Sequence, residues 1–113
     1  MFRDPDSGPP WLPRADVFKS AAGEFAIKVE LAGLRRGDVE LSIERQGIRI
    51  TGHRHDLDCT KARNQFVTPG IQWGWFDLLV NVPANYDLSR AAASYQNGLL
   101  RVIIPPLTGH KLA

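Results

Sequence analysis

Asn97 and Gly98 form the sequence feature that most limits how this chain can fold. On each side of the pair the residue pattern alternates with a period of two, which is typical of a β-strand with one buried face. The alternating positions are Ala91, Ala93 and Tyr95 before the pair and Leu100, Val102 and Ile104 after it. Asn and Gly both tolerate the positive φ of a type I′ turn, so this segment predicts a β-hairpin.

Four earlier stretches show the same period of two. Their apolar positions are Phe25, Ile27, Val29 and Leu31; Val39, Leu41 and Ile43; Ile48 and Ile50; and Phe76, Leu78, Val80 and Val82. The first three stretches follow one another at a spacing of roughly 8–12 residues, which is typical of an all-β sandwich. No sustained helical period occurs, and residues 84–93 leave room for one helical turn at most.

Three segments stand outside this rhythm. Residues 1–13 are rich in Pro, Asp, Ser and Gly, and we expect a flexible arm whose apolar residues Phe2, Trp11 and Leu12 have no evident core to join. Residues 55–73 form a polar stretch longer than the usual loop of about 4–6 residues, with a possible short strand at 64–67. We therefore expect a domain over residues 14–106 and a short tail over 107–113.

The size and composition of the chain indicate one globular domain. It has 113 residues, of which 43% are hydrophobic and 23% charged, and a chain of this size can bury a core without disulfides. The single cysteine, Cys59, excludes an internal disulfide and favours a reduced compartment. No signal-peptide pattern and no apolar run of roughly 18 residues is present. We expect a cytoplasmic protein without a membrane span.

The charged and titratable residues do not form a pattern typical of a catalytic or metal site. The net charge is +2, and basic residues alternate with acidic ones, which argues against a nucleic-acid surface. No nucleophile–base pair stands out, so we expect neither an enzyme nor a cofactor. His53, His55 and Cys59 lie close together, but a structural zinc site needs four ligands, and solvated histidines at a strand edge explain the pattern better.

The order of these segments resembles the α-crystallin domain of the small heat shock proteins. The C-terminal motif of that family, A-x-x-x-N-G-x-L, is matched by Ala93, Asn97, Gly98 and Leu100. Three further motifs are matched by Ala32, Gly33, Leu34, Arg36, Asp38 and Val39; by Ile48, Ile50, Gly52 and Arg54; and by Gly74, Phe76, Val82 and Pro83. Together the four motifs cover most of the chain, from residue 13 to residue 105.

The resemblance implies an immunoglobulin-like antiparallel β-sandwich of the α-crystallin type, with about 7–9 strands. It also implies a homodimer or larger oligomer, in which a strand of the long loop pairs with an early strand of the partner subunit. The expected interface residues are Asp16, Val17, Phe18, Asn64, Gln65, Phe66, Val67, Trp73 and Trp75. Alternation places both indoles on the face opposite Phe76, where they either serve the interface or pack over the sandwich edge and the loop.

The function implied by the resemblance is that of an ATP-independent holdase chaperone, which binds unfolding client proteins and limits their aggregation. A shallow groove between residues 39–44 and 91–96 would take extended client segments by backbone pairing. Its expected lining is Leu41, Ile43, Ala91, Ala93 and Tyr95. The alternative is a non-chaperone interaction module that keeps the same sandwich and binds one specific partner.

Three departures from the family pattern motivate that alternative. Leu78 stands where many members have an interface arginine, the arm is short, and no I-x-I/V motif follows the last strand. A further departure is Ala32, which replaces the usual proline. Leu79, Leu99 and Ile103 are apolar residues on the outer face of the sandwich. Either the arm, a partner or a client covers them, or they are single exposed aliphatics. Cys59 is either an inert exposed thiol or a cross-link between subunits.

Overall fold

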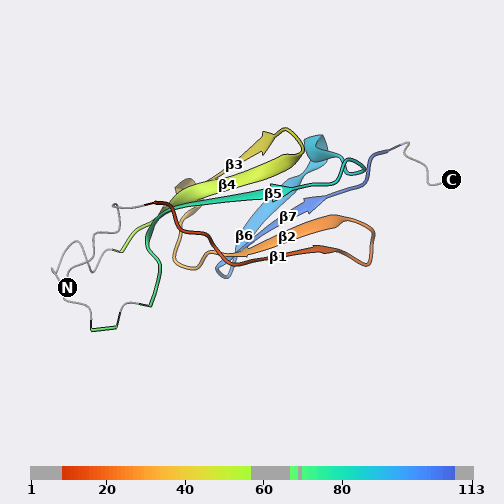
Figure 1. Cartoon of the computed structure of the whole chain (residues 1–113). Helices are drawn as coiled ribbons and strands as arrows, with labels where there is room; N and C mark the ends of the chain where they lie inside the picture. Colours follow the sequence, from red (N-terminus) through yellow and green to blue (C-terminus); the bar gives the residue numbers. More distant parts are fainter. Residues whose placement is uncertain (1–8, 57–66, 69, 109–113) are drawn as a thin grey trace.

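The computed structural model describes residues 9–56, 67–68 and 70–108, and within them the chain forms two antiparallel β-sheets. One sheet has the strand order β1-β2-β7-β6 and the other β3-β4-β5, and Figure 1 shows them as two layers. The strands are β1 (Ala15–Lys19), β2 (Phe25–Glu30), β3 (Val39–Glu44), β4 (Gly47–Arg54), β5 (Gly74–Asn81), β6 (Ala92–Gln96) and β7 (Leu99–Ile104). The all-β sandwich expected from the sequence is confirmed.

The core lies between the two sheets and consists of the residues that the period of two placed on one face. The fully buried side chains include Ile27, Val29, Leu31, Ile48, Ile50, Phe76, Val102 and Ile104. Leu31 directly follows β2, and the other side chains come from the inward positions of β2, β4, β5 and β7. Each such side chain contributes about 1.5–3 kcal/mol through its burial, so this face dominates the stability of the fold.

The Asn97-Gly98 hairpin has the geometry that the sequence predicts. Both residues have positive φ, 54° for Asn97 and 78° for Gly98, and the flanking Gln96 and Leu99 are paired. The turn also contacts the β2–β3 connection, since the Leu31 amide donates to the Gly98 carbonyl oxygen at 2.8 Å. A Cβ at Gly98 would stand 3.2 Å from Ala32, so the turn and this connection pack closely.

Gly52 in β4 allows the Asp38 backbone and the Phe76 ring to pack closely against this strand. A Cβ on this residue would clash with the backbone carbonyl oxygen of Asp38 and would lie 2.5 Å from the Phe76 ring. Gly52 is paired with Phe76 in the β4–β5 ladder and with Val39 in the β3–β4 ladder. A glycine here is therefore a packing requirement, because no room for a side chain exists.

Trp11 contacts the core, contrary to the expectation that the apolar residues of the arm have no core to join. Its backbone amide donates to the Trp75 carbonyl oxygen at 3.0 Å, and its carbonyl oxygen accepts from the Asp77 amide at 3.2 Å. Its ring packs on Phe76, with the centroids 5.4 Å apart. Trp11 therefore continues the β3-β4-β5 sheet beyond β5 as an isolated bridge. A lone anchored tryptophan has no periodicity, so the sequence pattern could not reveal it.

In the described part of the chain the connections contain two short 3₁₀ turns. They are η1 (Arg36–Asp38) before β3 and η2 (Leu88–Arg90) before β6, and the latter is the helical turn allowed for by residues 84–93. Neither these turns nor any other helix in the described part of the chain is long and apolar enough to cross a membrane. Of the loop strand predicted over 64–67, residues 64–66 lie outside the described residues, and Val67 lies in a bend.

Candidate functional site

The candidate site is a groove between β3 and β6, the two strands that end their sheets on the same side of the sandwich. Each strand is paired on one side only, so the backbone groups of its other edge face the groove. A pocket of about 280 Å³ lies between them. Its lining consists of Arg36, Val39, Leu41, Ala93, Ser94, Tyr95 and Leu100.

Apolar side chains line this groove from both strands. Leu41 is paired with the buried Ile50, and Ala93 with the buried Val102, so both residues point to the inner side of their sheets. No neighbouring strand covers them there, and Leu41 keeps 38% of its surface exposed. The groove thus offers apolar contacts beside open strand edges, which is the combination needed to bind an extended chain segment.

Tyr95 lines the groove and is held in place by two hydrogen bonds. Its hydroxyl donates to the Leu31 carbonyl oxygen at 2.6 Å and accepts from the Leu34 amide at 3.3 Å. Both partners belong to the connection between β2 and η1, so the tyrosine joins the β6 edge to the neighbouring layer. Because its polar group is satisfied inside the fold, the ring presents mainly an apolar surface.

Three of the five residues predicted to line the groove do so in the structure. Leu41, Ala93 and Tyr95 line the pocket together, whereas Ile43 and Ala91 are outside its lining. Ile43 lies further along β3 and is 59% exposed, and Ala91 precedes β6 at the end of η2 and packs against the core. Arg36, Val39, Ser94 and Leu100 were not predicted. Arg36 and Val39 belong to one of the matched family motifs, and this motif is the signal that could have identified them.

A second open edge belongs to β1, where the early interface residues were predicted. All five residues of β1 are exposed, including Asp16, Val17 and Phe18, and the strand is paired only with β2. The Phe18 ring lies 6.0 Å from the Lys28 ammonium nitrogen on the outer face. Asn64, Gln65 and Phe66 are outside the described residues, and Val67 is 97% exposed. The part these residues take in a dimer stays a prediction.

The two indoles near the start of β5 lie on different sides of the sheet, so the prediction that they share one face is wrong. Trp73 lies beside Arg54, with the guanidinium carbon 5.4 Å from its ring, and Arg54 also lies 4.4 Å from the Trp11 ring that packs on the core. Trp75 is 58% exposed and meets the His53 ring edge-on at 4.6 Å. Gly74 between them has a φ of 96°, which interrupts the alternation of a regular strand.

Arg54 is a buried cation at the end of the sandwich. Its guanidinium donates to the Gln72 carbonyl oxygen at 2.8 and 3.0 Å and to the Ala32 carbonyl oxygen at 3.2 Å. Burial lowers the pKa of Arg54 from its ordinary value, while the charge of Glu30 acts in the opposite direction. The residue fastens the start of β5 to the β2–β3 connection and so has a structural role.

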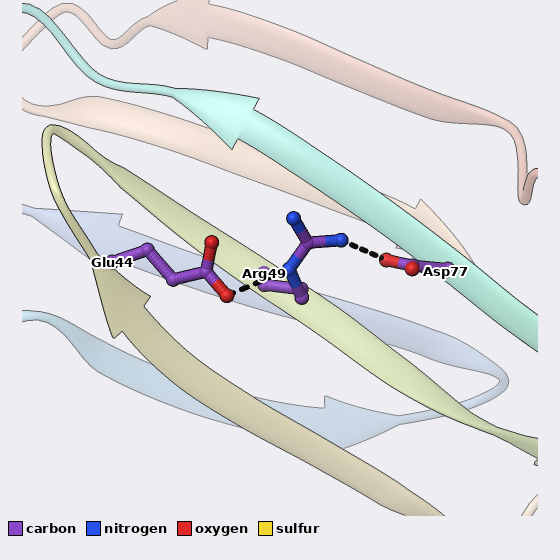
Figure 2. Close-up of polar contacts among 3 residues, drawn as sticks. All are labelled: Glu44, Arg49 and Asp77. Carbon is purple, nitrogen blue, oxygen red and sulfur yellow. Dashed lines mark hydrogen bonds and ion pairs between the residues drawn. The ribbon is translucent and has the colours of Figure 1, made fainter.

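Arg49 joins all three strands of the smaller sheet on its outer face. Figure 2 shows its guanidinium between Glu44 of β3 and Asp77 of β5, and both N···O distances are 2.7 Å. Hydrogen bonds to Glu44 and Asp77 raise the pKa of Arg49 from its ordinary value. Because β3 is an edge strand, this network helps to hold one wall of the groove against its sheet.

The histidine pair does not assemble a metal site in the described part of the chain. The rings of His53 and His55 lie 4.1 Å apart, and the Nε2 atom of His55 is 3.9 Å from the Oδ1 atom of Asp38. No group of three or more potential ligands that could hold a metal occurs among the described residues. Cys59, the third residue of the candidate cluster, lies outside them.

Comparison with known proteins identifies the family. Residues 17–112 match the model of the Hsp20/alpha crystallin family. The chain belongs to the Hsp20/alpha-crystallin family. Its members are small heat shock proteins, which are non-enzymatic chaperones and typically oligomeric, so the classification as a protein without enzymatic activity agrees with the family.

Relatives of the Hsp20/alpha-crystallin family support this assignment in sequence and in structure. Small heat shock protein C2 of Rickettsia felis is 27% identical over 94 residues, covering 83% of this chain and 60% of the relative. A 21.9 kDa heat shock protein of Oryza sativa is 27% identical over 109 residues, covering 88% and 52%. A small heat shock protein structure from Xylella fastidiosa superposes with a TM-score of 0.78 at 23% identity, covering 93% of this chain and 94% of that one. The chain therefore spans about half to three fifths of the two sequence relatives.

Proposed function

We propose that this protein is an ATP-independent holdase, which binds non-native segments of unfolding proteins and limits their aggregation. The single observation that carries the proposal is the groove between the open edges of β3 and β6, with apolar side chains exposed at Leu41 and Ala93. A folded monomer with no need for this surface would cover or charge such edges, because open edges promote aggregation.

Binding in the groove would proceed by strand addition. An extended client segment pairs its backbone with the free edge of β3 or β6, and its small apolar side chains contact Leu41, Ala93 and the Tyr95 ring. Each backbone hydrogen bond contributes about 0.5–1.5 kcal/mol, so a short segment binds weakly and reversibly. Such binding acts on the non-native client by mass action and requires neither ATP nor a cofactor.

We also propose a homodimer or larger oligomer, in which the β1 edge of one subunit pairs with residues 64–67 of the other. All five residues of β1 are exposed, with Val17 at 47% and Phe18 at 41%, which supports an intermolecular partner for this edge. A cytoplasmic setting fits the single cysteine. Light scattering coupled to size exclusion tests the assembly, and a monomer at working concentration would contradict it.

A heat-aggregation assay with a thermolabile enzyme tests the holdase activity. Equimolar dimer is expected to delay the rise in light scattering when the enzyme is heated, with ATP absent. Unchanged aggregation at this ratio would contradict the proposal.

A second candidate function is that of an interaction module that binds one specific partner on the same sandwich. It is favoured by Leu78, a half-buried residue paired with Ile50 and packed against the core, at a position where the family pattern has an interface arginine. Capture of one stoichiometric partner, with no broad set of heat-denatured proteins, would support this candidate over the chaperone.

A further inference from the structure

Among the described residues, Arg36 is the only charged side chain in the lining of the β3–β6 groove. The other six lining residues are Val39, Leu41, Ala93, Ser94, Tyr95 and Leu100, which are apolar or uncharged. Arg36 lies in η1, directly before β3, and lines the same pocket as Tyr95. A ligand that occupies the groove therefore passes next to one positive charge.

The guanidinium of Arg36 is available to a ligand. It is exposed, and it makes no hydrogen bond or ion pair with any residue in the described part of the chain. The acid nearest in sequence, Asp38, accepts a hydrogen bond from the Arg35 amide at 3.0 Å and lies 3.9 Å from His55, beside a different pocket. Glu40 is paired with Thr51 on the outer face of β3, away from the groove.

We propose that the groove prefers extended segments in which an Asp or Glu adjoins small apolar residues, with Arg36 pairing with the carboxylate. This inference rests on the proposed client-binding function and adds a charge preference to it. An arginine can donate two parallel hydrogen bonds to a carboxylate, which fixes the position of the bound segment as well as attracting it. A lysine or arginine at this position of the bound segment would face the like charge of Arg36. Apolar segments without an acid would still bind through the strand edges.

Short fluorescent peptides test the preference in a direct way. They share an alternating Val-Thr core and carry Asp, Asn or Lys at both ends, and their affinities are measured by fluorescence anisotropy with the full chain. We expect the Asp peptide to bind about two- to five-fold more tightly than the Asn peptide, as is typical of exposed ion pairs, and the Lys peptide to bind least. The difference should shrink as the salt concentration rises.

Charge-reversal variants separate Arg36 from the general charge of the protein. In Arg36→Glu the order of the Asp and Lys peptides should invert. Arg101→Glu is the matched control, because Arg101 is exposed and is not part of the groove lining. It lies on the outer face of β7, with Lys28 and Ser94 as its ladder partners. The control should retain the order found with the unaltered protein.

Three results would overturn the inference. Equal affinities for the Asp and Asn peptides would leave a client groove without charge preference. An equal response of the Arg36→Glu and Arg101→Glu variants would assign the preference to net charge. Failure of all three peptides to bind would remove the groove as a client site, and with it both the inference and this part of the proposed function.

Discussion

The Tyr95 hydroxyl donates a hydrogen bond to the Leu31 carbonyl oxygen at 2.6 Å, across the space between the β6 edge and the end of β2. The same hydroxyl accepts from the Leu34 amide at 3.3 Å. One side chain thus satisfies two backbone groups of a connection that has no regular structure. This contact fixes one lining residue of the groove that we assign to client binding.

Removal of this hydroxyl should loosen the groove wall. Tyr95→Phe leaves a backbone donor and a backbone acceptor without their partner, and we expect the free energy of unfolding to fall by about 1–2 kcal/mol. Urea denaturation followed by tryptophan fluorescence measures it. Tyr86→Phe is the control, since Tyr86 is buried in the core and its hydroxyl makes no hydrogen bond with a described residue. Equal losses in the two variants would contradict the role given to the Tyr95 hydroxyl.

Gly52→Ala should destabilise the fold strongly for its size. The added Cβ would meet the Asp38 carbonyl oxygen and the Phe76 ring, and neither the β-ladder backbone nor the buried ring can move without disturbing the core. Overpacking of this kind costs about 1–3 kcal/mol. Gly37→Ala is the matched control, because its Cβ would point into open space. Thermal unfolding of the two variants decides the matter, and similar melting temperatures would show that the clash is relieved cheaply.

Trp11→Ala should weaken the end of the sandwich although the residue precedes the first strand. It removes the ring between Phe76 and Arg54, at 5.4 and 4.4 Å, and leaves the buried guanidinium less well packed. We expect a loss of about 2–3 kcal/mol, below the usual range for a fully buried tryptophan because Trp11 is only half-buried. Leu12→Ala, at a neighbouring residue that is 66% exposed, should change stability little. An unaltered urea midpoint for Trp11→Ala would mean that this residue is not anchored.

Arg49→Gln should reduce stability only slightly, and the reduction should shrink at high salt, because its ion pairs with Glu44 and Asp77 are solvent-accessible. The folded pKa of Arg49 is raised, so its stabilising contribution is present below the unfolded pKa and is lost only at strongly alkaline pH. Urea midpoints at neutral pH and at two salt concentrations measure the effect. A large loss that does not depend on salt would indicate a packing role instead.

The strands could be predicted because their burial has a local signature. Val29 and Ile50 each stand between two polar residues, and the structure buries both. The orientation of Trp73 could not be predicted in this way, because the positive φ of Gly74 turns the chain between two tryptophans that alternation places together. Conformation at one glycine is a property of the folded backbone and leaves no period in the sequence.

The groove was predictable only in part for a different reason. Alternation identifies which residues of β3 and β6 point inward, and so it finds Leu41, Ala93 and Tyr95. It cannot say where along the two strands the pocket lies, and the structure leaves Ile43 outside its lining and places Arg36 in it. The position of the pocket depends on packing between strands distant in sequence.

Suppression of client aggregation by two variants, each with one alanine of β6 replaced by glutamine, tests the central claim most directly. Ala93→Gln places a longer polar side chain in the groove, whereas Ala92→Gln makes the same change at the neighbouring exposed residue of β6, outside the groove lining. With both variants folded and of the same assembly size as the unaltered protein, we expect Ala93→Gln to lose most of its protection of a heated enzyme and Ala92→Gln to keep it. Full protection by Ala93→Gln would contradict client binding in the β3–β6 groove.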